Sequence, residues 1–354
     1  MLSVSGEYGI VNQIEFQGRS FAGESVAEYH VVETNDIVYT KSPLKANPYG
    51  IIKVNNGAPG IVSTLYAVYH PCEGTVAEYI DYYFGNDLRL NKYLKPLVNI
   101  GAKHDMKVNN ETVLTGEVYF PDYSEQKKIV SFLAILDERI RQQRNLVEAL
   151  KKYKRGLHKL VFIKKRKHSW EKSALHDIAS FCGGGTPSKD VSSYWEGEIG
   201  WISSSDIQEE WIDDISVTRR ITKTAIDNSA TKHCPEGTIA IVSRVGVGKV
   251  AIMPESLCTS QDFTNITSIT GNTHYMAYQI AFRMKLEAMK TQGTSIKGVT
   301  ADTIKAMVLD IPPLEEQKKI ADMLTAFDAY IKRAVCELDL FLAMKKALLQ
   351  QLFI

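Results

Sequence analysis

The sequence predicts an α+β protein in which two mixed, strand-rich globular domains are separated by two long helices. Three observations lead to this fold class: a segment that occurs twice, an apolar heptad pattern inside each copy, and short β-branched or aromatic runs bounded by turn residues elsewhere. At 354 residues the chain is long enough for two such domains in addition to the helices.

The repeated segment begins Phe-Pro-Asp-Tyr-Ser-Glu-Gln-Lys-Lys-Ile at Phe120 and Ile-Pro-Pro-Leu-Glu-Glu-Gln-Lys-Lys-Ile at Ile311. The match continues without a gap to Phe162 in the first copy and Phe353 in the second. A shift of 191 residues pairs Leu133 with Leu324, Asp137 with Asp328, and Lys154 with Lys345.

Apolar residues recur in both copies with a 3.5-residue period over about five heptads, which predicts two coiled-coil helices of roughly 60 Å each. The predicted seam consists of Ile129, Leu133, Leu136, Ile140, Val147, Leu150, Leu157, Ile320, Leu324, Phe327, Ile331, Leu338, Phe341 and Leu348. The pattern allows parallel or antiparallel pairing, within one chain or between chains. Lys154 and Lys345 interrupt the seam; they either fix the register or extend their amines to water, and the second interpretation is favoured.

Strand and helix signals outside the repeat divide the chain into five segments. The predicted strands of the first domain lie at 36–39, 51–54 and 61–69, and a helix is predicted over 76–94; the strand 237–242 and the helix 274–290 repeat this plan in the second domain. The predicted segments are a first domain at 1–119, a long helix at 120–163, a basic connection at 164–169, a second domain at 170–310 and a second long helix at 311–354.

Charge is nearly balanced over the chain but unevenly placed. Residues 151–167 carry nine of the 42 Lys and Arg residues and no acidic one, which indicates either a polyanion partner or a solvated helix face. Five cysteines without a Cys-x-x-Cys spacing predict buried thiols in a reducing compartment, with neither a disulfide framework nor a zinc site. The sequence has no signal peptide and no run of 18 apolar residues, so we expect no membrane contact and a cytoplasmic location.

No catalytic or metal-binding constellation is evident, so the sequence predicts a protein that is not an enzyme and holds no metal. Val245–Lys249 resembles a phosphate loop but lacks the spacing between its glycines and the hydroxyl residue after the lysine. The eight histidines form no metal-ligand spacing with a Cys or carboxylate residue. The adjacent pairs Glu209-Glu210 and Asp213-Asp214 are predicted to be solvated surface.

DNA binding fits the sequence better, because it requires cations for phosphates and a few side chains that hydrogen-bond to base edges. Arg244 is the strongest candidate, since it follows a hydrophobic strand and precedes a glycine-rich turn. Each candidate could instead be a solvated surface residue. The candidates are Lys41, Lys45, Asn47, Tyr49, Lys103 and His104 in the first domain, and Ser203, Ser204, Ser205, Arg219, Arg220, Lys223, Arg244, Lys249, Gln261 and Lys297 in the second.

Short motifs of the second domain add to the duplicated helix. They are Gly-Gly-Thr-Pro-Ser at 184–188, Tyr194-Trp195, and Gly-Trp-Ile-Ser at 200–203; the glycine-rich loop 183–188 is predicted to be a turn with unusual backbone angles. With Glu-Gln-Lys-Lys-Ile present twice, the chain resembles the DNA-specificity subunit of type I restriction-modification enzymes along essentially its whole length.

The resemblance implies two target recognition domains, each reading one half of a bipartite site in double-stranded DNA, and an antiparallel coiled coil that acts as a spacer between them. It implies that the subunit itself is non-catalytic and binds no cofactor. The expected partners are methyltransferase subunits, most simply two, which use S-adenosylmethionine, and restriction endonuclease or translocase subunits.

The first domain departs from this pattern at its start. Leu2–Ser5 aligns best with Ile202–Ser205, so the opening segment of the second domain has no full counterpart, and we expect the first domain to be truncated. The alternative function is a coiled-coil assembly scaffold without DNA recognition. The two hypotheses differ in that phosphate contacts make DNA binding fall steeply with salt.

Overall fold

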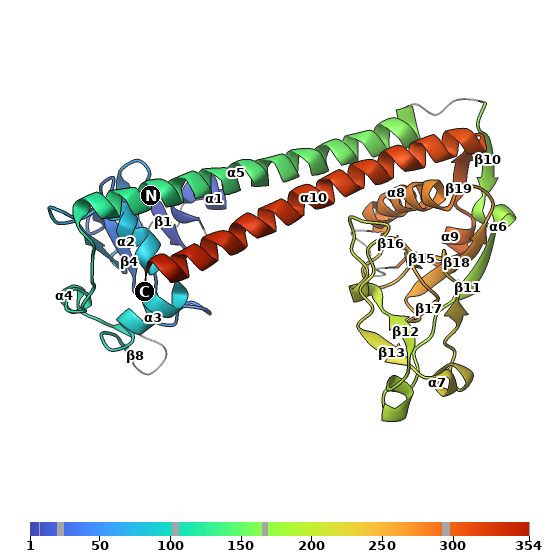
Figure 1. Ribbon diagram of the computed structural model, residues 1–354, viewed down its shortest axis with the longest axis horizontal. Helices are drawn as coiled ribbons and strands as arrows, with labels where there is room; N and C mark the ends of the chain where they lie inside the picture. The colour runs from blue at the N-terminus through green and yellow to red at the C-terminus, as the bar shows by residue number, and fades with distance from the viewer. Residues whose placement is uncertain (7, 20–24, 101–105, 165–168, 292–297, 354) are drawn as a thin grey trace. The chain divides into compact units, whose positions relative to one another are not determined.

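The computed structural model describes residues 1–6, 8–19, 25–100, 106–164, 169–291 and 298–353 (Figure 1). The chain forms two compact units: unit 1 comprises Met1–Asn145 with Val335–Ile354, and unit 2 comprises Leu146–Ala334. Both units combine strands and helices, and each contains part of both long helices. The predicted α+β class is confirmed, whereas the five predicted segment boundaries remain a sequence-based division.

The two long helices are α5 (Tyr123–Lys159), which continues into the π-helical turn η2 (Leu160–Lys164), and α10 (Leu314–Leu352). Asp122 caps α5 by accepting a hydrogen bond from the Glu125 amide at 2.9 Å. Acidic residues in both first turns suit the positive end of the helix dipole.

The helices pair antiparallel within the chain. In unit 1, the Arg139 guanidinium lies 6.0 Å from the centre of the Phe341 ring, and Gln143 Nε2 lies 3.2 Å from Glu337 Oε2. Residues later in α5 therefore contact residues earlier in α10, as in an antiparallel pair. In unit 2, the Tyr153 and Phe327 rings are 5.4 Å apart, and Leu157 packs in the same core as Leu324. This confirms the antiparallel coiled coil.

The predicted seam residues point into this pairing to different degrees. Six are fully buried, namely Leu133, Leu136, Ile140, Val147, Leu324 and Ile331, and the other eight are half-buried. The interpretation that Lys154 extends to water is wrong, because its side chain is 13% exposed and its Nζ lies 2.7 Å from Asp328 Oδ1. Lys345 likewise forms an ion pair with Asp137.

Unit 1 contains small sheets covered by short helices. The predicted helix over 76–94 is two helices, because α2 stops at Gly85 and Asn86 caps α3 by accepting from the Leu88 and Arg89 amides at 3.0 and 3.3 Å. The elements are β1 (Leu2–Ser5), β2 (Gly9–Asn12), α1 (Gln13–Gln17), β3 (His30–Val32), β4 (Ile37–Thr40), β5 (Ile52–Val54), β6 (Gly60–Val62), β7 (Tyr66–Tyr69), α2 (Ala77–Phe84), α3 (Asp87–Leu94), β8 (Asn99–Ile100), β9 (Met106–Lys107) and α4 (Asn110–Val113).

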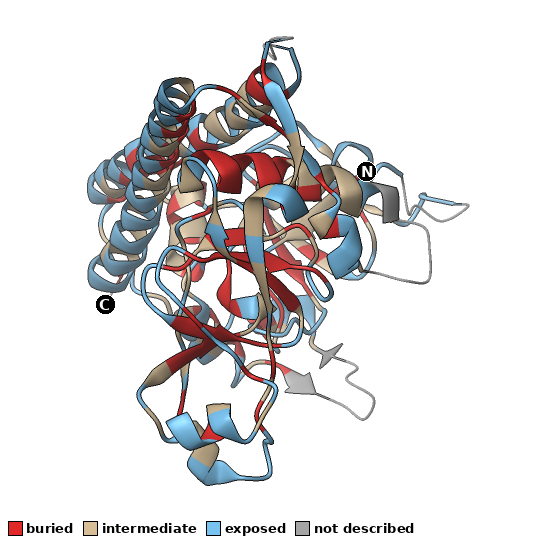
Figure 2. Ribbon diagram, turned by 90° about the vertical axis from the view of Figure 1, so that its right-hand side faces the viewer, coloured by how far each residue is buried: buried red, intermediate tan, exposed pale blue. Residues whose placement is uncertain are grey.

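Unit 2 contains two four-stranded sheets, ordered β11-β18-β15-β16 and β13-β12-β17-β14, and a strand pair β10-β19. Its buried residues concentrate in these strands and in α8 (Figure 2). The elements are β10 (Glu171–Ala174), α6 (Leu175–Ile178), β11 (Ala179–Gly183), η3 (Ser192–Trp195), β12 (Ile199–Ile202), η4 (Ser204–Asp206), β13 (Arg219–Ile221), α7 (Lys223–Asp227), β14 (His233–Cys234), β15 (Ile239–Val242), β16 (Val250–Ile252), β17 (Leu257–Thr259), β18 (Phe263–Ile269), α8 (Thr273–Thr291), α9 (Ala301–Lys305) and β19 (Val308–Ile311).

The internal repeat extends to strand register. In unit 1, Ile37 of β4 is opposite Val54 of β5, and in unit 2, Ile239 of β15 is opposite Ile252 of β16. The two central sheets are therefore built alike, and Val54 and Ile252 occupy equivalent positions on their edge strands.

The cysteines differ in burial. Cys234 and Cys258 are buried and Cys182 is half-buried, but the prediction of buried thiols is wrong for Cys72 and Cys336, which are exposed. Among the residues that the structure describes, no helix is both long and apolar enough to cross a membrane.

Candidate nucleic-acid interface

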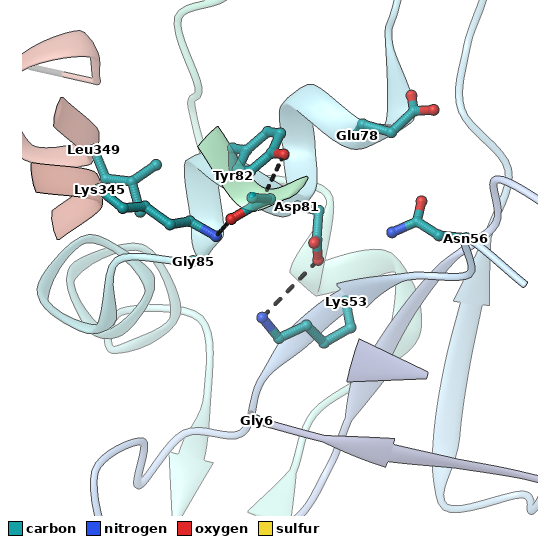
Figure 3. Close-up of a pocket in the computed structure, with 10 residues that line it drawn as sticks. Gly6, Lys53, Asn56, Glu78, Asp81, Tyr82, Gly85, Lys345 and Leu349 are labelled. Carbon is teal, nitrogen blue, oxygen red and sulfur yellow. Dashed lines mark hydrogen bonds and ion pairs between the residues drawn. The ribbon is translucent and has the colours of Figure 1, made fainter. Parts of the chain in front are cut away.

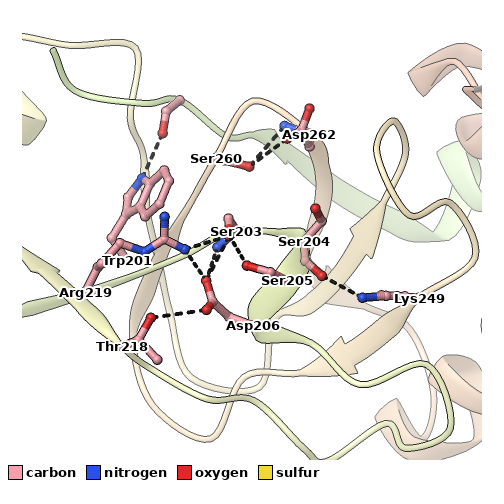
Figure 4. Close-up of polar contacts among 11 residues, drawn as sticks. Trp201, Ser203, Ser204, Ser205, Asp206, Thr218, Arg219, Lys249, Ser260 and Asp262 are labelled. Carbon is pink, nitrogen blue, oxygen red and sulfur yellow. Dashed lines mark hydrogen bonds and ion pairs between the residues drawn. The ribbon is translucent and has the colours of Figure 1, made fainter. Parts of the chain in front are cut away.

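A loop of three serines follows β12 in unit 2, and its shape is set by hydrogen bonds to Asp206. Ser203 donates to Asp206 Oδ2 from its amide at 2.7 Å and from its hydroxyl at 2.9 Å, while the Asp206 amide donates to the Ser203 carbonyl at 2.9 Å (Figure 4). This is a capping box on η4. The Ser205 hydroxyl lies 2.9 Å from that of Ser203, so the serine hydroxyls have fixed positions.

Arg219 reaches this loop from the neighbouring strand, because β13 pairs with β12 and sets Arg219 opposite Trp201. Its guanidinium lies 4.5 Å from the centre of the Trp201 ring, donates to Ser203 Oγ at 2.6 Å and forms an ion pair with Asp206. Trp201 is itself fixed by donating from Nε1 to the Gly185 carbonyl at 2.9 Å. Arg219 therefore holds the serine loop in place.

The charge of Asp206 is stabilised by the same contacts. Burial alone would raise the pKa of this carboxyl group, but the hydrogen bonds from the Ser203 amide and hydroxyl and from Arg219 outweigh it and hold the pKa below its usual range. The loop is therefore tied to an ionised carboxylate at neutral pH.

Two further candidates, Lys249 and Arg244, flank the turn after β15. Lys249 Nζ donates to the Ser204 carbonyl at 2.8 Å, which joins this turn to the serine loop. Gly246 and Gly248 have φ angles of 84° and 105°, a region that favours glycine, so they serve the turn. Arg244 is exposed, and within the described part of the chain it has no hydrogen-bond or ion-pair partner.

The glycine-rich loop lies beside the Gln261 loop, because Thr186 Oγ1 donates to Gln261 Oε1 and the Gly185 amide donates to the Thr259 carbonyl at 2.8 Å. The prediction of unusual backbone angles is wrong, since these glycines have no positive φ. They are needed for space: a Cβ on Gly184 would lie 1.9 Å from the Ser260 carbonyl oxygen. The Asp262 carbonyl accepts from the Ser243 amide and hydroxyl at 2.8 and 2.9 Å, so Gln261 and Arg244 lie on neighbouring loops.

The remaining candidates are more scattered. Arg220 is exposed and donates to the Glu198 carbonyl at 2.6 Å, and Lys223 is exposed at the start of α7. In unit 1, Lys45 is exposed, Lys41 and Tyr49 are half-buried, and Asn47 is buried, donating to Asp87 at 2.8 Å and accepting from Asn91 at 3.2 Å. Lys103, His104 and Lys297 lie outside the described residues.

Sequence reasoning did not single out Asp206 or the segment that follows it. The pattern Ser203-x-x-Asp206 is a capping-box signature that could have pointed to Asp206. The next residues, 207–215, form what we call the Trp211 arm, closed at its base by the bridge between Ile207 and Ile215.

The Trp211 arm docks on the helix pair within unit 2. Two lysines form cation–π contacts with the Trp211 ring: Lys154 Nζ lies 4.5 Å and Lys332 Nζ 5.3 Å from the ring centre. Glu210 is 3.1 Å from Lys151, and Asp213 is 2.7 Å from Lys332. The prediction of solvated surface is confirmed for Glu210 and Asp213, whose side chains are 46% and 50% exposed, and both also form ion pairs with lysines of the helix pair.

Comparison with known proteins finds similarity to one family, and the matching family model lies mainly in unit 2. Residues 167–335 match the family model of the type I restriction modification DNA specificity domain. The chain is 34% identical over 167 residues to the type I restriction enzyme MjaIX specificity subunit of Methanocaldococcus jannaschii, covering 46% of this chain and 39% of that protein. It is 30% identical over 186 residues to the EcoR124I/EcoR124II specificity subunit of Escherichia coli, covering 50% and 45%. The chain thus spans less than half the length of these relatives.

Solved structures resemble the fold of the whole chain. A chain from a study of complex assembly and conformational transition of the type I restriction-modification system superposes with a TM-score of 0.59 at 16% identity, covering 93% of this chain and 84% of that one. The S subunit of a type I restriction-modification system from M. genitalium superposes with a TM-score of 0.56 at 11% identity, covering 92% and 84%.

Proposed function

We propose that this chain recognises duplex DNA as the specificity subunit of a type I restriction-modification system, because residues 167–335 match the DNA specificity domain of such systems. The observation that carries the proposal is the preorganised polar surface of unit 2. There the serine loop is held by Arg219, Asp206 and Lys249. Arg244, exposed in the turn that Lys249 ends, has no hydrogen-bond or ion-pair partner among the described residues.

The proposed division of labour follows from the contacts. Arg219 and Lys249 bind to the protein and position the loop. The Ser203 hydroxyl donates to Asp206 and accepts from Arg219, so the Ser204 hydroxyl and the exposed Ser205 side chain are the groups left to contact DNA. Arg244 is free to make the bidentate contact with a guanine edge for which arginine is suited, and Lys223 to contact a phosphate. A rigid loop that needs no reordering on binding loses less conformational entropy.

Unit 1 would read the second half of a bipartite site, with Lys41, Lys45 and Tyr49 as its described candidates. The paired helices α5 and α10, of 37 and 39 residues, would be the spacer that fixes the distance between half-sites. Each is about 55–60 Å long at 1.5 Å per residue.

The helices also offer faces for partner subunits. On α5, Tyr123, Phe132 and Ile135 are 47%, 52% and 68% exposed and border one surface hollow. On α10 the repeat counterparts of the first two, Leu314 and Met323, are 49% and 42% exposed. Two equivalent apolar faces suit two copies of one partner. We take these to be methyltransferase subunits, which would supply S-adenosylmethionine and the chemistry, with an endonuclease subunit joining them; this chain would be non-catalytic.

Co-expression with a methyltransferase subunit, followed by genome-wide mapping of methylated adenines, tests the proposal. We expect one split motif with a fixed gap, and its appearance should depend on this chain. Methylation at a continuous motif, or at the same sites without this chain, would contradict DNA recognition by it.

A further inference from the structure

A cluster of one lysine, one aspartate and one tyrosine occurs in each unit. In unit 2, Asp328 accepts from Tyr278 Oη at 2.9 Å and pairs with Lys154. In unit 1, Asp137 accepts from Tyr82 Oη at 2.8 Å and pairs with Lys345. The aspartates are repeat counterparts, and so are the lysines, so these clusters are equivalent places in the fold.

Unit 2 covers its cluster with the Trp211 arm. Besides its pair with Asp328, Lys154 Nζ donates to the Glu210 carbonyl and lies against the Trp211 ring. Beyond Trp211, the Ile212 carbonyl accepts from the amide of Ile252 on the edge strand β16 at 2.6 Å. The arm leaves the side chains of Lys154 and Asp328 only 13% and 4% exposed.

Unit 1 has a cavity at the equivalent place. It measures about 310 Å³ and is lined by the cluster itself and by Gly6, Lys53, Glu78, Asp81 and Leu349, among others (Figure 3). The side chains of Lys345 and Asp137 are 28% and 36% exposed. The amide of Val54, the equivalent of Ile252, donates to Asp81 Oδ1 at 3.2 Å in place of an arm carbonyl.

We propose that this cavity is a docking site for a peptide segment of a partner protein that presents an aromatic side chain next to a carboxylate. Lys345 has the donors to bind a carbonyl of that segment and the position to lie against its ring, as Lys154 does in unit 2. Arg141, the repeat counterpart of Lys332, is 70% exposed one turn from Asp137 and pairs with Glu138. It would turn from Glu138 to bind the carboxylate of the segment, as Lys332 binds Asp213.

The volume and chemistry suit such an occupant. A cavity near 300 Å³ is at the lower end of the range for specific ligand sites. Two lysines and three carboxylates line it, and ion pairs join Lys53 to Asp81 at 4.0 Å and Lys345 to Asp137, so the lining is close to neutral and accepts a ring as well as a polar backbone. The inference does not rest on DNA recognition by unit 2.

The arm supplies the probe for a test on the full-length chain. A synthetic peptide of residues 208–215 carrying 5-fluorotryptophan at the place of Trp211 is titrated with the protein and followed by ¹⁹F NMR. We expect saturable broadening and a shift of the fluorine resonance, with a Kd on the order of 1 mM. An unlabelled peptide with alanine in place of the tryptophan should fail to compete.

Variants locate the binding. Gly6→Trp should fill the cavity and weaken binding at least tenfold, because a Cβ at Gly6 meets nothing within 4 Å and φ lies outside the left-handed region. Gly156→Trp, at a helix position where a Cβ also has open space, should leave binding unchanged. Should Gly6→Trp lower the thermal unfolding midpoint, Lys345→Met provides a second test and should also weaken binding at least tenfold.

Three results would overturn the proposal: no saturable signal up to about 5 mM protein or peptide, equal competition by the alanine peptide, or undiminished binding to both cavity variants. Loss of DNA binding by the chain would leave these results unaffected, so the failure of one proposal is distinguishable from that of the other.

Discussion

At the scale of single residues, Arg219 and Arg244 look alike in the sequence but differ in their contacts. Arg219 is bound to Ser203, Asp206 and the Trp201 ring, whereas Arg244 is exposed and makes no such contact within the described chain. The difference predicts that Arg219 contributes to the stability of the fold, whereas Arg244 contributes to DNA binding and not to stability.

Arg244→Ala should leave the free energy of unfolding within about 0.5 kcal/mol of the wild type, yet weaken specific DNA binding by about 1–3 kcal/mol, because a bidentate base contact is lost. Arg219→Ala should lower both, since Asp206 and Ser203 lose a partner. Thermal unfolding and DNA titration of both variants give the comparison. Equal effects of the two substitutions on stability would contradict the assignment.

His158 supplies a pH-dependent prediction in unit 2. It lies between the rings of Phe162 and Tyr278, its Nε2 is buried without a hydrogen-bond partner in the described structure, and burial followed by the charge of Lys154 lowers its pKa to about 3. Because the unfolded chain binds a proton below about pH 6.5 and the folded chain does not, stability falls as pH drops from 6.5 towards 3.

His158→Leu removes this dependence, and leucine is the residue at the repeat-equivalent position, Leu349. The difference in unfolding free energy between the variant and the wild type should be about 2 kcal/mol larger, in favour of the variant, at pH 5 than at pH 8. Urea unfolding at the two pH values measures the difference. A pH-independent difference would mean that His158 is protonated in the folded protein.

The sequence predicts several residues of the candidate interface but not their contacts. Ser203, Arg219 and Lys249 were predicted as candidates and do lie together, because short strand signals and polar loop residues are local features. Which arginine is committed to the protein depends on the register of β13 against β12, which juxtaposes Arg219 and Trp201. Register between strands that are distant in the chain leaves no local signal.

At the scale of elements, the helix pair combines an apolar seam with one buried and one half-buried ion pair. Lys154 and Asp328 are 13% and 4% exposed, whereas Lys345 and Asp137 are 28% and 36% exposed. A charge left unpaired in the more buried cluster costs more, because less water can solvate it.

Lys154→Met should therefore destabilise the protein by about 3–5 kcal/mol, and Lys345→Met by about 1 kcal/mol or less. Combining Lys154→Met with Asp328→Leu should recover much of the first loss, since no unpaired charge remains. Chemical denaturation of the wild type, the two single variants and the double variant gives a double-mutant cycle for this ion pair. Equal costs for the two lysines would refute the dependence on burial.

The heptad pattern predicted both helices because periodicity is carried by neighbouring residues. The pattern did not predict that Lys154 is buried in an ion pair, because its partners Asp328 and Trp211 come from other parts of the chain. The break at Gly85 was missed for a different reason: the apolar stripe continues across it, while the Asn86 cap that starts α3 is a single residue.

At the scale of the whole molecule, we propose that the helix pair sets the gap of a bipartite DNA site. The repeat gives a symmetric way to shorten it. Deleting residues 142–148 and 333–339, which are repeat counterparts, removes one heptad from each helix and retains the residues of both ion pairs, Asp137 with Lys345 and Lys154 with Asp328.

The decisive measurement is the methylation map of cells that express this shortened chain with a methyltransferase subunit. Seven residues correspond to about 10 Å of helix, or about three base pairs of DNA. If the helix pair is the spacer, the same two half-site sequences should appear with a gap about three base pairs shorter. An unchanged gap, or altered half-site sequences, would contradict it.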